Sequence, residues 1–414
     1  MIILSHPTGN ANVRAIASSF DNNNMLSQFH TSIAAYPGNF WYFLGSLDAL
    51  KSFKRREFDK ELKDKIYTHP YKELGRFTAK SLNINSLIER EVGLFCVDAI
   101  YHYLDKKVAL ALEKSSSVDD IKVVYAYEDG ALETFKEAKK KGYVCVYDLP
   151  IAYWEKGRTL MLHEAERLPE WADTLGGGIL DSEQKLERKV KELELADIVV
   201  GPGSFVLDSL PEWASAKNKI MSPFGSPLVP FFQEKKIRKD GDPLRILFVG
   251  SMGQRKGLGD LFEAGKLLKN ENIEIVVLGS LLQTMEFYKG QFSDFVYEGI
   301  RSHKEVLEVM RSCDIFCLPS IVEGRALVMQ EAMSQGLPLI ITANTGGADL
   351  IKHGETGFLV PINSPEKIAE KISWFNENRS LIPEMSRKAY EHSQNYTWEK
   401  YGDKIVRNIK EMIL

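Results

Sequence analysis

Short apolar runs alternate with stretches of helical periodicity along most of the chain. These runs are closed by glycine, proline or polar residues and lie at 1–4, 122–127, 143–147, 245–249, 273–278, 315–318 and 337–341. Runs of this kind, ended by turn signals, are typical of strands buried on both faces of a parallel sheet. Their alternation with helical stretches predicts an α/β fold made of doubly wound parallel sheets.

The chain is long enough for two domains. Its 414 residues, 44% of them hydrophobic, suffice for two separate cores. A stretch rich in proline, glycine and serine is followed by a polar, turn-rich run that ends near residue 241. We therefore predict a first domain at 1–220, a linker at 221–241, a second domain at 242–390 and a final helical segment at 391–414.

Charge and cysteine content exclude several classes of protein. The net charge of -4 gives no overall attraction to nucleic acid or to an anionic membrane. Four cysteines do not make a disulfide framework, which fits a reducing compartment, and we expect Cys313 and Cys317 to be small buried residues. The apolar start is too short for a signal peptide, and the sequence contains no run of about eighteen apolar residues. We expect a soluble, cytoplasmic protein.

One basic cluster stands out from this balanced background. The cluster consists of Lys51, Lys54, Arg55 and Arg56. It lies on a stretch with helical periodicity that continues to residue 65. A solvated amphipathic face is the favoured interpretation. The alternative is peripheral contact at the inner face of a membrane, with anionic headgroups or a lipid-diphosphate acceptor.

Two carboxylates in the stretch 313–347 suggest a binding site. Glu323 lies beside a glycine at the end of a predicted strand, and Glu331 lies in the helix that follows. The first amides of that helix, near 325–328, suit a phosphate, whereas a carboxylate beside them suits the hydroxyls of a sugar or ribose. The alternative is that Glu323 only favours the helix start and Glu331 is a solvated helix residue.

A second loop carries cations. Gly250, Gly253 and Gly257 surround Arg255 and Lys256 directly before a predicted helix. Phosphate recognition needs both a flexible backbone and cationic side chains. The alternative is an ordinary strand-to-helix turn with exposed basic residues.

These motifs resemble those of a known family. The run PSIVEGRALVMQEAMSQGLPLI, followed by Gly346 and Gly347, is similar to the donor-site signature of retaining family 4 glycosyltransferases (GT4, glycosyl transferases group 1). It departs from the usual pattern at Arg325 and Ala326. The resemblance implies the GT-B fold, with two Rossmann-like domains facing across a cleft. It also implies that the last helix crosses back onto the first, acceptor-binding domain.

The resemblance implies retaining transfer of a hexose, most simply glucose, from a nucleotide diphosphate sugar, most simply UDP-glucose. The acceptor would be a saccharide or lipid-linked molecule in polysaccharide biosynthesis. We expect no cofactor beyond this co-substrate and no metal, because cationic side chains replace it. The predicted catalytic residues are Glu323, Lys256, Arg255 and Asp148. Asp148 stands where much of the family has a histidine.

The resemblance also predicts the residues that bind the donor. They are Gly9, Asn10, Gly250, Ser251, Gly299, Ile300, Arg301, Gly324, Arg325, Ala326, Leu327, Val328 and Glu331. Residues 299–301 would frame the base, and Glu331 would hold the ribose. Arg325 would add a cation for the diphosphate, since Ser251 replaces an arginine that is usual in the family.

Two other functions remain compatible with the sequence. A nucleotide-sugar 2-epimerase shares the expected fold but lacks the EGRALVMQEAM pattern. A degenerate nucleotide-sugar-binding protein without turnover would explain the departures at Ser251, Arg325 and Ala326.

Overall fold

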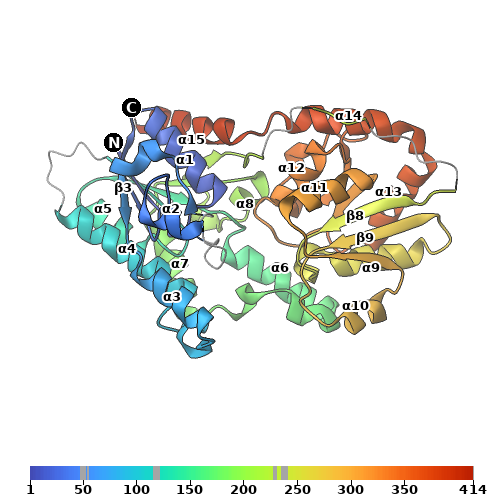
Figure 1. Ribbon diagram of the computed structural model, residues 1–414, viewed down its shortest axis with the longest axis horizontal. Coiled ribbons are helices and arrows are strands. Elements are labelled where there is room, and N and C mark those ends of the chain that lie inside the picture. Colours follow the sequence, from blue (N-terminus) through green and yellow to red (C-terminus); the bar gives the residue numbers. More distant parts are fainter. Residues whose placement is uncertain (47–52, 54–55, 115–121, 227–230, 235–240, 414) are drawn as a thin grey trace.

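The computed structural model describes residues 1–46, 53, 56–114, 122–226, 231–234 and 241–413. Two α/β domains lie side by side along the long axis of the molecule (Figure 1). Each contains one parallel sheet with helices packed around it, so the predicted fold class is confirmed.

The first domain is built on a seven-stranded sheet with strand order β3-β2-β1-β4-β5-β6-β7. All neighbouring strands in it run parallel. The strands are β1 (Ile2–Ser5), β2 (Leu26–Thr31), β3 (Ile66–Thr68), β4 (Val123–Tyr127), β5 (Val144–Asp148), β6 (Ile198–Gly201) and β7 (Asn218–Met221). The α-helices are α1 (Ala11–Asn22), α2 (Phe40–Gly45), α3 (Tyr71–Ser81), α4 (Val97–Lys114), α5 (Leu132–Lys140), α6 (Trp154–Arg167), α7 (Glu183–Leu195) and α8 (Ser204–Asp208).

The second domain is built on a six-stranded sheet with strand order β10-β9-β8-β11-β12-β13, again parallel throughout. The strands are β8 (Leu244–Val249), β9 (Ile273–Leu278), β10 (Phe295–Gly299), β11 (Ile315–Leu318), β12 (Leu339–Thr342) and β13 (Gly357–Val360). The α-helices are α9 (Leu258–Leu267), α10 (Met285–Gln291), α11 (His303–Ser312), α12 (Leu327–Ser334), α13 (Pro365–Glu377) and α14 (Ile382–Ser393).

Each sheet reverses its strand order at one point. In the first sheet this point lies between β1 and β4, and in the second between β8 and β11. Ligands of open α/β sheets bind outside the carboxyl ends of the strands at such a switch point. Arg255 and Lys256, the predicted cations, lie after β8, and the predicted carboxylate Glu323 lies in the loop after β11.

Two of the described segments pack into the opposite domain. The last helix, α15 (Trp398–Ile413), packs along α1, and its Tyr401, Ile405 and Ile409 join the core of the first domain (Figure 1). In the other direction, the 3-10 turn η4 (Pro169–Thr174), which follows α6, places Trp171 in the core of the second domain. The connection is therefore made at both ends of the interface.

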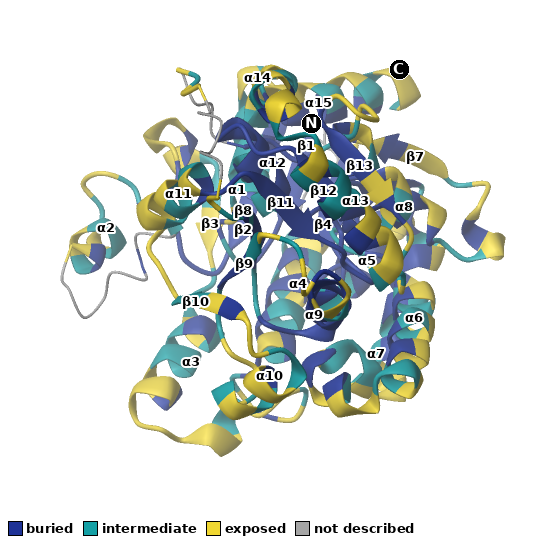
Figure 2. Cartoon of the chain, turned by 90° about the vertical axis from the view of Figure 1, so that its right-hand side faces the viewer, coloured by how far each residue is buried: buried dark blue, intermediate teal, exposed yellow. Residues whose placement is uncertain are grey.

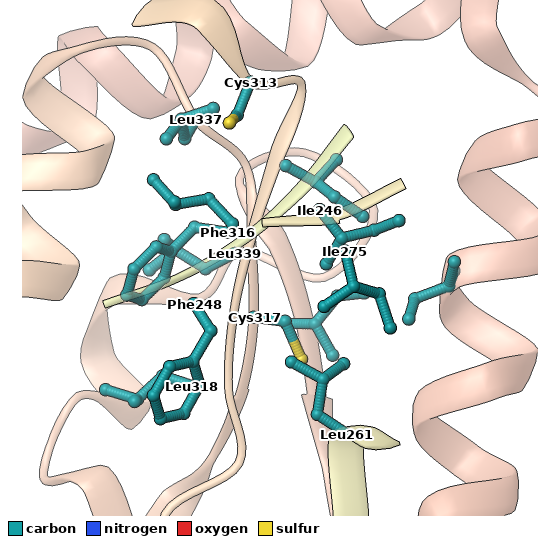
Figure 3. Packing of buried hydrophobic residues seen from close by; sticks show 14 of the residues in the cluster. Ile246, Phe248, Leu261, Ile275, Cys313, Phe316, Cys317, Leu318, Leu337 and Leu339 are labelled. Atoms are coloured by element: carbon teal, nitrogen blue, oxygen red, sulfur yellow. The ribbon is translucent and has the colours of Figure 1, made fainter. Parts of the chain in front are cut away.

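The cores lie along the strands. In Figure 2 the central strands of both sheets are buried, while exposed residues gather on the outer helices and on the edge strands β3 and β10. Cys313 and Cys317 are fully buried among the apolar side chains of the second sheet (Figure 3), which confirms that they pack as small core residues. No helix in the described part of the chain is long and apolar enough to cross a membrane.

The helical pattern predicted up to residue 65 is wrong for its described part. Glu57 forms a parallel bridge with Ala35, and the helical residues of the described part are in 3-10 turns, at Phe53, Arg56 and Lys60–Asp64. Phe58 and Leu62 are buried in the core of the first domain, so packing there overrides the local periodicity. Lys51, Lys54 and Arg55 lie outside the described residues.

Candidate functional site

Three of the predicted catalytic residues meet at the switch point of the second sheet. The ammonium Nζ of Lys256 lies 2.6 Å from Oε1 of Glu323, and a guanidinium nitrogen of Arg255 lies 2.9 Å from the same oxygen. Arg255 also donates to the backbone carbonyl of Val322 at 3.0 Å. Two cations thus converge on one carboxylate oxygen, with all three side chains partly accessible.

Glycines allow this approach. The side chain of Lys256 runs across Gly250, where a Cβ atom would lie 2.6 Å from the lysine Cδ. Gly250 has a φ of +151°, and Gly257 has a φ of +75° with its Cα against the carbonyl of Pro319. Both conformations favour glycine over other residues. Next to Gly250, the backbone carbonyl of Ser251 accepts from the N–H of Gly253 at 2.8 Å, which tightens the loop.

The loop after β11 is held by its neighbours. The N–H of Ile321 donates to the carbonyl of Arg255 at 2.9 Å, and the N–H of Glu323 donates to the carbonyl of Asn344 at 3.1 Å. Gly324 presses on the first domain, since a Cβ there would lie 1.7 Å from the carbonyl oxygen of Pro150. The carboxylate therefore sits at the contact between the domains.

The helix α12 begins directly after this loop. Ala326 is its N-cap, and Leu327 and Val328 form its first turn. The first amides of an α-helix have no intrahelical acceptor and carry partial positive charge. Predicted donor residues Gly324 to Val328 thus occupy a helix start beside the two cations.

Arg325 does not face this site, and the prediction that it adds a cation for the diphosphate is wrong. Its guanidinium is fully buried and pairs with Asp349 at 2.7 Å. It also donates to Gln330 at 2.7 Å and to the carbonyl of Gly346 at 2.8 Å, and it lies over the ring of Tyr396. The arginine holds the glycine loop after β12 against α12 instead.

Glu331 lies on the next turn of α12. Burial raises the pKa of its carboxyl, an effect that the nearby His303 opposes. The ring nitrogen Nδ1 of His303 lies 3.9 Å from Oε1 of Glu331. His303 begins α11, and it is a site neighbour that the sequence did not reveal.

The predicted base-site residues follow β10. Gly299 has a φ of +73°, which turns the chain, and the side chain of Ile300 is 76% exposed. Arg301 pairs with Glu298 at 2.9 Å on the surface, as expected of an exposed ion pair. In this structure the contacts available at 299–301 are therefore mainly backbone groups and the exposed isoleucine.

The first domain contributes residues from its own switch point. Gly9 packs beside Phe58, and Asn10 precedes α1 and accepts from the hydroxyl of Thr8 at 3.1 Å. Asn10 lines a cavity of about 520 Å³, together with His6, Tyr101, Glu128, Asp129 and Lys185 among others. The loops after β1 and β4 thus face one space.

Asp148 is set apart from the three other predicted catalytic residues. It ends β5, is 1% exposed, and accepts a hydrogen bond of 2.5 Å from the hydroxyl of Tyr125. Burial raises the pKa of Asp148 to about 7, although the neighbouring tyrosine hydroxyls lower it. The structure places it in the core of the first domain, where it does not reach a ligand between the domains.

A smaller cavity of about 210 Å³ is lined by residues of both domains. Glu128 and Lys189 line it from the first domain, and Arg255 and Val322 line it from the second. Glu128 borders both cavities. Arg255 is thus in contact with a space that the first domain also lines.

Comparison with known families places the match in the second domain. Residues 231–394 match the family model described as Glycosyl transferases group 1. An uncharacterized glycosyltransferase of Methanocaldococcus jannaschii is 31% identical over 166 residues, which cover 40% of this chain and 47% of the relative. The amylovoran biosynthesis glycosyltransferase AmsK of Erwinia amylovora is 32% identical over 141 residues, covering 31% and 34%. The chain thus spans less than half the length of these relatives.

Solved structures match over the whole chain. Sucrose-phosphate synthase from Thermosynechococcus elongatus has a TM-score of 0.63 at 15% identity, covering 99% of this chain and 98% of the other. Anabaena HepE in complex with UDP and glucose has a TM-score of 0.57 at 15% identity, covering 99% of both. At such identities the likeness concerns the fold alone. The chain has the two-domain α/β fold of these proteins, GT-B, and its residues 231–394 resemble the glycosyl transferases of group 1.

Proposed function

We propose that this protein is a retaining GT4 glycosyltransferase that uses a nucleotide diphosphate sugar, most simply UDP-glucose. The observation that carries the proposal is the convergence of Lys256 and Arg255 on Glu323 at the switch point of the second sheet. The family match at 231–394 and relatives named as polysaccharide glycosyltransferases support it. Neither the epimerase nor the non-catalytic alternative has comparable support.

The chemistry follows from the charges. As the bond between sugar and diphosphate breaks, negative charge gathers on the leaving phosphate. Lys256, Arg255 and the amides of Leu327 and Val328 are preorganised to stabilise that charge, and such stabilisation is usually the largest catalytic term. Cationic side chains and helix amides fill this role without a metal.

Glu323 has a second role in this scheme. Its carboxylate pairs with both cations through one oxygen. A diphosphate that takes its place beside them frees the carboxylate to accept hydrogen bonds from sugar hydroxyls. Glu331 would accept from the ribose hydroxyls, and 299–301 would frame the base.

The acceptor would bind in the first domain. The cavity of about 520 Å³ lies at the carboxyl ends of β1 and β4 and is lined by hydroxyl, amide and carboxylate groups. Groups of this kind hydrogen-bond to saccharides. We propose a saccharide, free or lipid-linked, as the acceptor, in line with relatives that bear names from capsular and amylovoran biosynthesis.

The donor assignment is tested by binding and turnover. UDP, GDP and ADP are compared by the rise in melting temperature that each causes, since a ligand that binds only the folded protein stabilises it. UDP should give the largest shift, and UDP-glucose should be slowly hydrolysed or transferred. Lys256→Ala should abolish turnover, whereas Lys266→Ala, on the surface of α9, should not. Turnover that survives Lys256→Ala would exclude the proposed site.

Membrane contact remains a proposal with a revised set of residues. Arg56 pairs with Glu73 and lies over the ring of Phe77, so it is held inside the domain. The short helix α2 instead presents Phe40 and Phe43, 64% and 65% exposed, just before the basic sequence that includes Lys51, Lys54 and Arg55. Exposed aromatic residues beside cations suit an anionic bilayer surface.

Co-sedimentation with vesicles tests this contact. Binding is expected to vesicles that contain phosphatidylglycerol and not to pure phosphatidylcholine. It should fall in Phe40→Ser/Phe43→Ser, while turnover of a water-soluble acceptor stays unchanged. Equal sedimentation of the variant and the wild type would argue against α2 as the contact.

A further inference from the structure

Gln254 directly precedes the two cations and is fully buried. Its side-chain nitrogen Nε2 donates to Oε1 of Glu164 at 2.6 Å and to Oδ2 of Asp260 at 2.9 Å. Its oxygen Oε1 accepts from the N–H of Gly259 at 2.7 Å. All the hydrogen-bonding groups of the amide are therefore directed to partners, which fixes its orientation.

Part of this support comes from the other half of the chain. Glu164 lies on α6, and Thr174, at the end of η4, accepts from the backbone N–H of Gln254 at 2.9 Å. Arg167, also on α6, bonds to Glu164 and pairs with Asp260 at 2.8 Å. The carboxylates that flank the amide are thus neutralised in part by one guanidinium.

The segment that carries these residues is built into the second domain. Trp171 is 1% exposed, and its ring lies 5.0 Å from that of Phe287 and 6.1 Å from that of Phe262. Gly253 permits the contact, because a Cβ there would lie 2.6 Å from the carbonyl oxygen of Thr174. In Figure 1, α6 extends from the first domain toward α9 and α10 of the second. The loop 250–257, which carries the two cations (the cation loop), therefore packs against a segment from the first half of the sequence.

Only an amide meets the demands of this position. A carboxylate has no donor for Glu164 and Asp260, and an ammonium has no acceptor for the N–H of Gly259. Glutamine supplies both and adds no charge between the two carboxylates. Because Arg255 and Lys256 follow it directly, these hydrogen bonds anchor the chain from which the two cations extend.

We propose that Gln254 is a positioning residue for the donor diphosphate, held by Glu164 and Asp260, so that donor affinity depends on the α6–η4 segment. The inference rests on the proposed function, in which Arg255 and Lys256 bind the diphosphate. It extends that function by assigning control of the cation loop to residues outside the donor motif.

The test is Gln254→Glu, which keeps the shape and the acceptor for Gly259 but places a third carboxylate beside Glu164 and Asp260. UDP affinity, measured by calorimetry, should fall about tenfold or more, since a charge-assisted hydrogen bond is replaced by repulsion. UMP, which lacks the β-phosphate, should bind within about twofold of its wild-type affinity. The matched control is Gln233→Glu, at an exposed position, which should change neither.

The double variant Gln254→Glu/Glu164→Gln reverses the roles of the two side chains and restores an amide–carboxylate pair. It should recover most of the lost UDP affinity. Equal UDP affinity of Gln254→Glu and the wild type, or an equal loss for UDP and UMP, would overturn the inference. If the wild type bound none of UDP, GDP and ADP, the proposed donor site itself would be wrong.

Discussion

Oε1 of Glu323 accepts from Lys256 at 2.6 Å and lies 2.9 Å from Arg255, so the carboxylate occupies the position beside the cations that the proposed diphosphate would take. In the proposed function, the ion pair and a bound phosphate would compete for the same two cations. This competition separates the two roles assigned to Glu323, because loss of its charge affects binding of the leaving group and transfer of the sugar in opposite directions.

Glu323→Gln should therefore bind UDP at least as tightly as the wild type does, while sugar transfer falls about a hundredfold. The neutral amide no longer competes for Lys256 and Arg255, but it holds the sugar hydroxyls less well. Calorimetry with UDP and steady-state kinetics with UDP-glucose measure the two effects, with Glu399→Gln as a control. Weaker UDP binding by Glu323→Gln would contradict the competition.

The parts of this site that the sequence predicted are local ones. Lys256 and Glu323 belong to short motifs at the ends of apolar strands, and the strand order of a doubly wound sheet brings such loops together. The strands β8, β9 and β11 were also predictable from local sequence, since continuous apolar runs mark buried strands.

Long-range partners were not predictable. The role of Arg325 is set by Asp349 and Tyr396, and that of Gln254 by Glu164, which lies ninety positions away. The helical pattern before residue 65 failed because Glu57 forms a bridge with Ala35, a partner more than twenty positions away. No local pattern carries this information, since each position alone is compatible with several partners.

Arg325→Phe tests the structural role of the arginine. Loss of its bonds to Asp349, Gln330 and the carbonyl of Gly346 should lower the free energy of unfolding by about 2 kcal/mol. UDP affinity should change by less than about threefold, because the guanidinium points away from the cations. Urea denaturation and calorimetry give the two values. Arg387→Ala, which removes exposed ion pairs with Glu384 and Glu391 on α14, should lower the free energy of unfolding much less than Arg325→Phe does. A large loss of UDP affinity in Arg325→Phe without loss of stability would show that Arg325 contributes to donor binding after all.

Asp148→Asn tests the buried carboxyl through its pH dependence. Burial raises the pKa of Asp148 from 3.8 in the unfolded chain to about 7. Between about pH 4 and pH 7 the folded state therefore holds a proton that the unfolded state has released, and this group makes the free energy of unfolding decrease as the pH rises. Asparagine cannot ionise and still accepts from Tyr125.

The stability advantage of Asp148→Asn over the wild type should therefore be larger at pH 8 than at pH 5, by a few kcal/mol. Urea denaturation at the two pH values measures it. Asp208→Asn, at an exposed position on α8, should show no such difference. An advantage that does not vary with pH would show that Asp148 ionises normally in the folded protein.

Glu331→Gln tests the ribose assignment. A carboxylate that accepts from ribose hydroxyls favours UDP over 2′-deoxyUDP, because the deoxy ligand leaves the partly buried acceptor unpaired. Burial raises the pKa of Glu331, which shows that its charged form is poorly solvated and gains from a hydroxyl donor. In the wild type we expect UDP to bind about tenfold more tightly than 2′-deoxyUDP, and in Glu331→Gln this ratio should fall to about two. Competition binding with both nucleotides measures the ratio, and Glu308→Gln, exposed on α11, should retain it. A ratio that stays at its wild-type value in Glu331→Gln would move the ribose contact to another residue of the site.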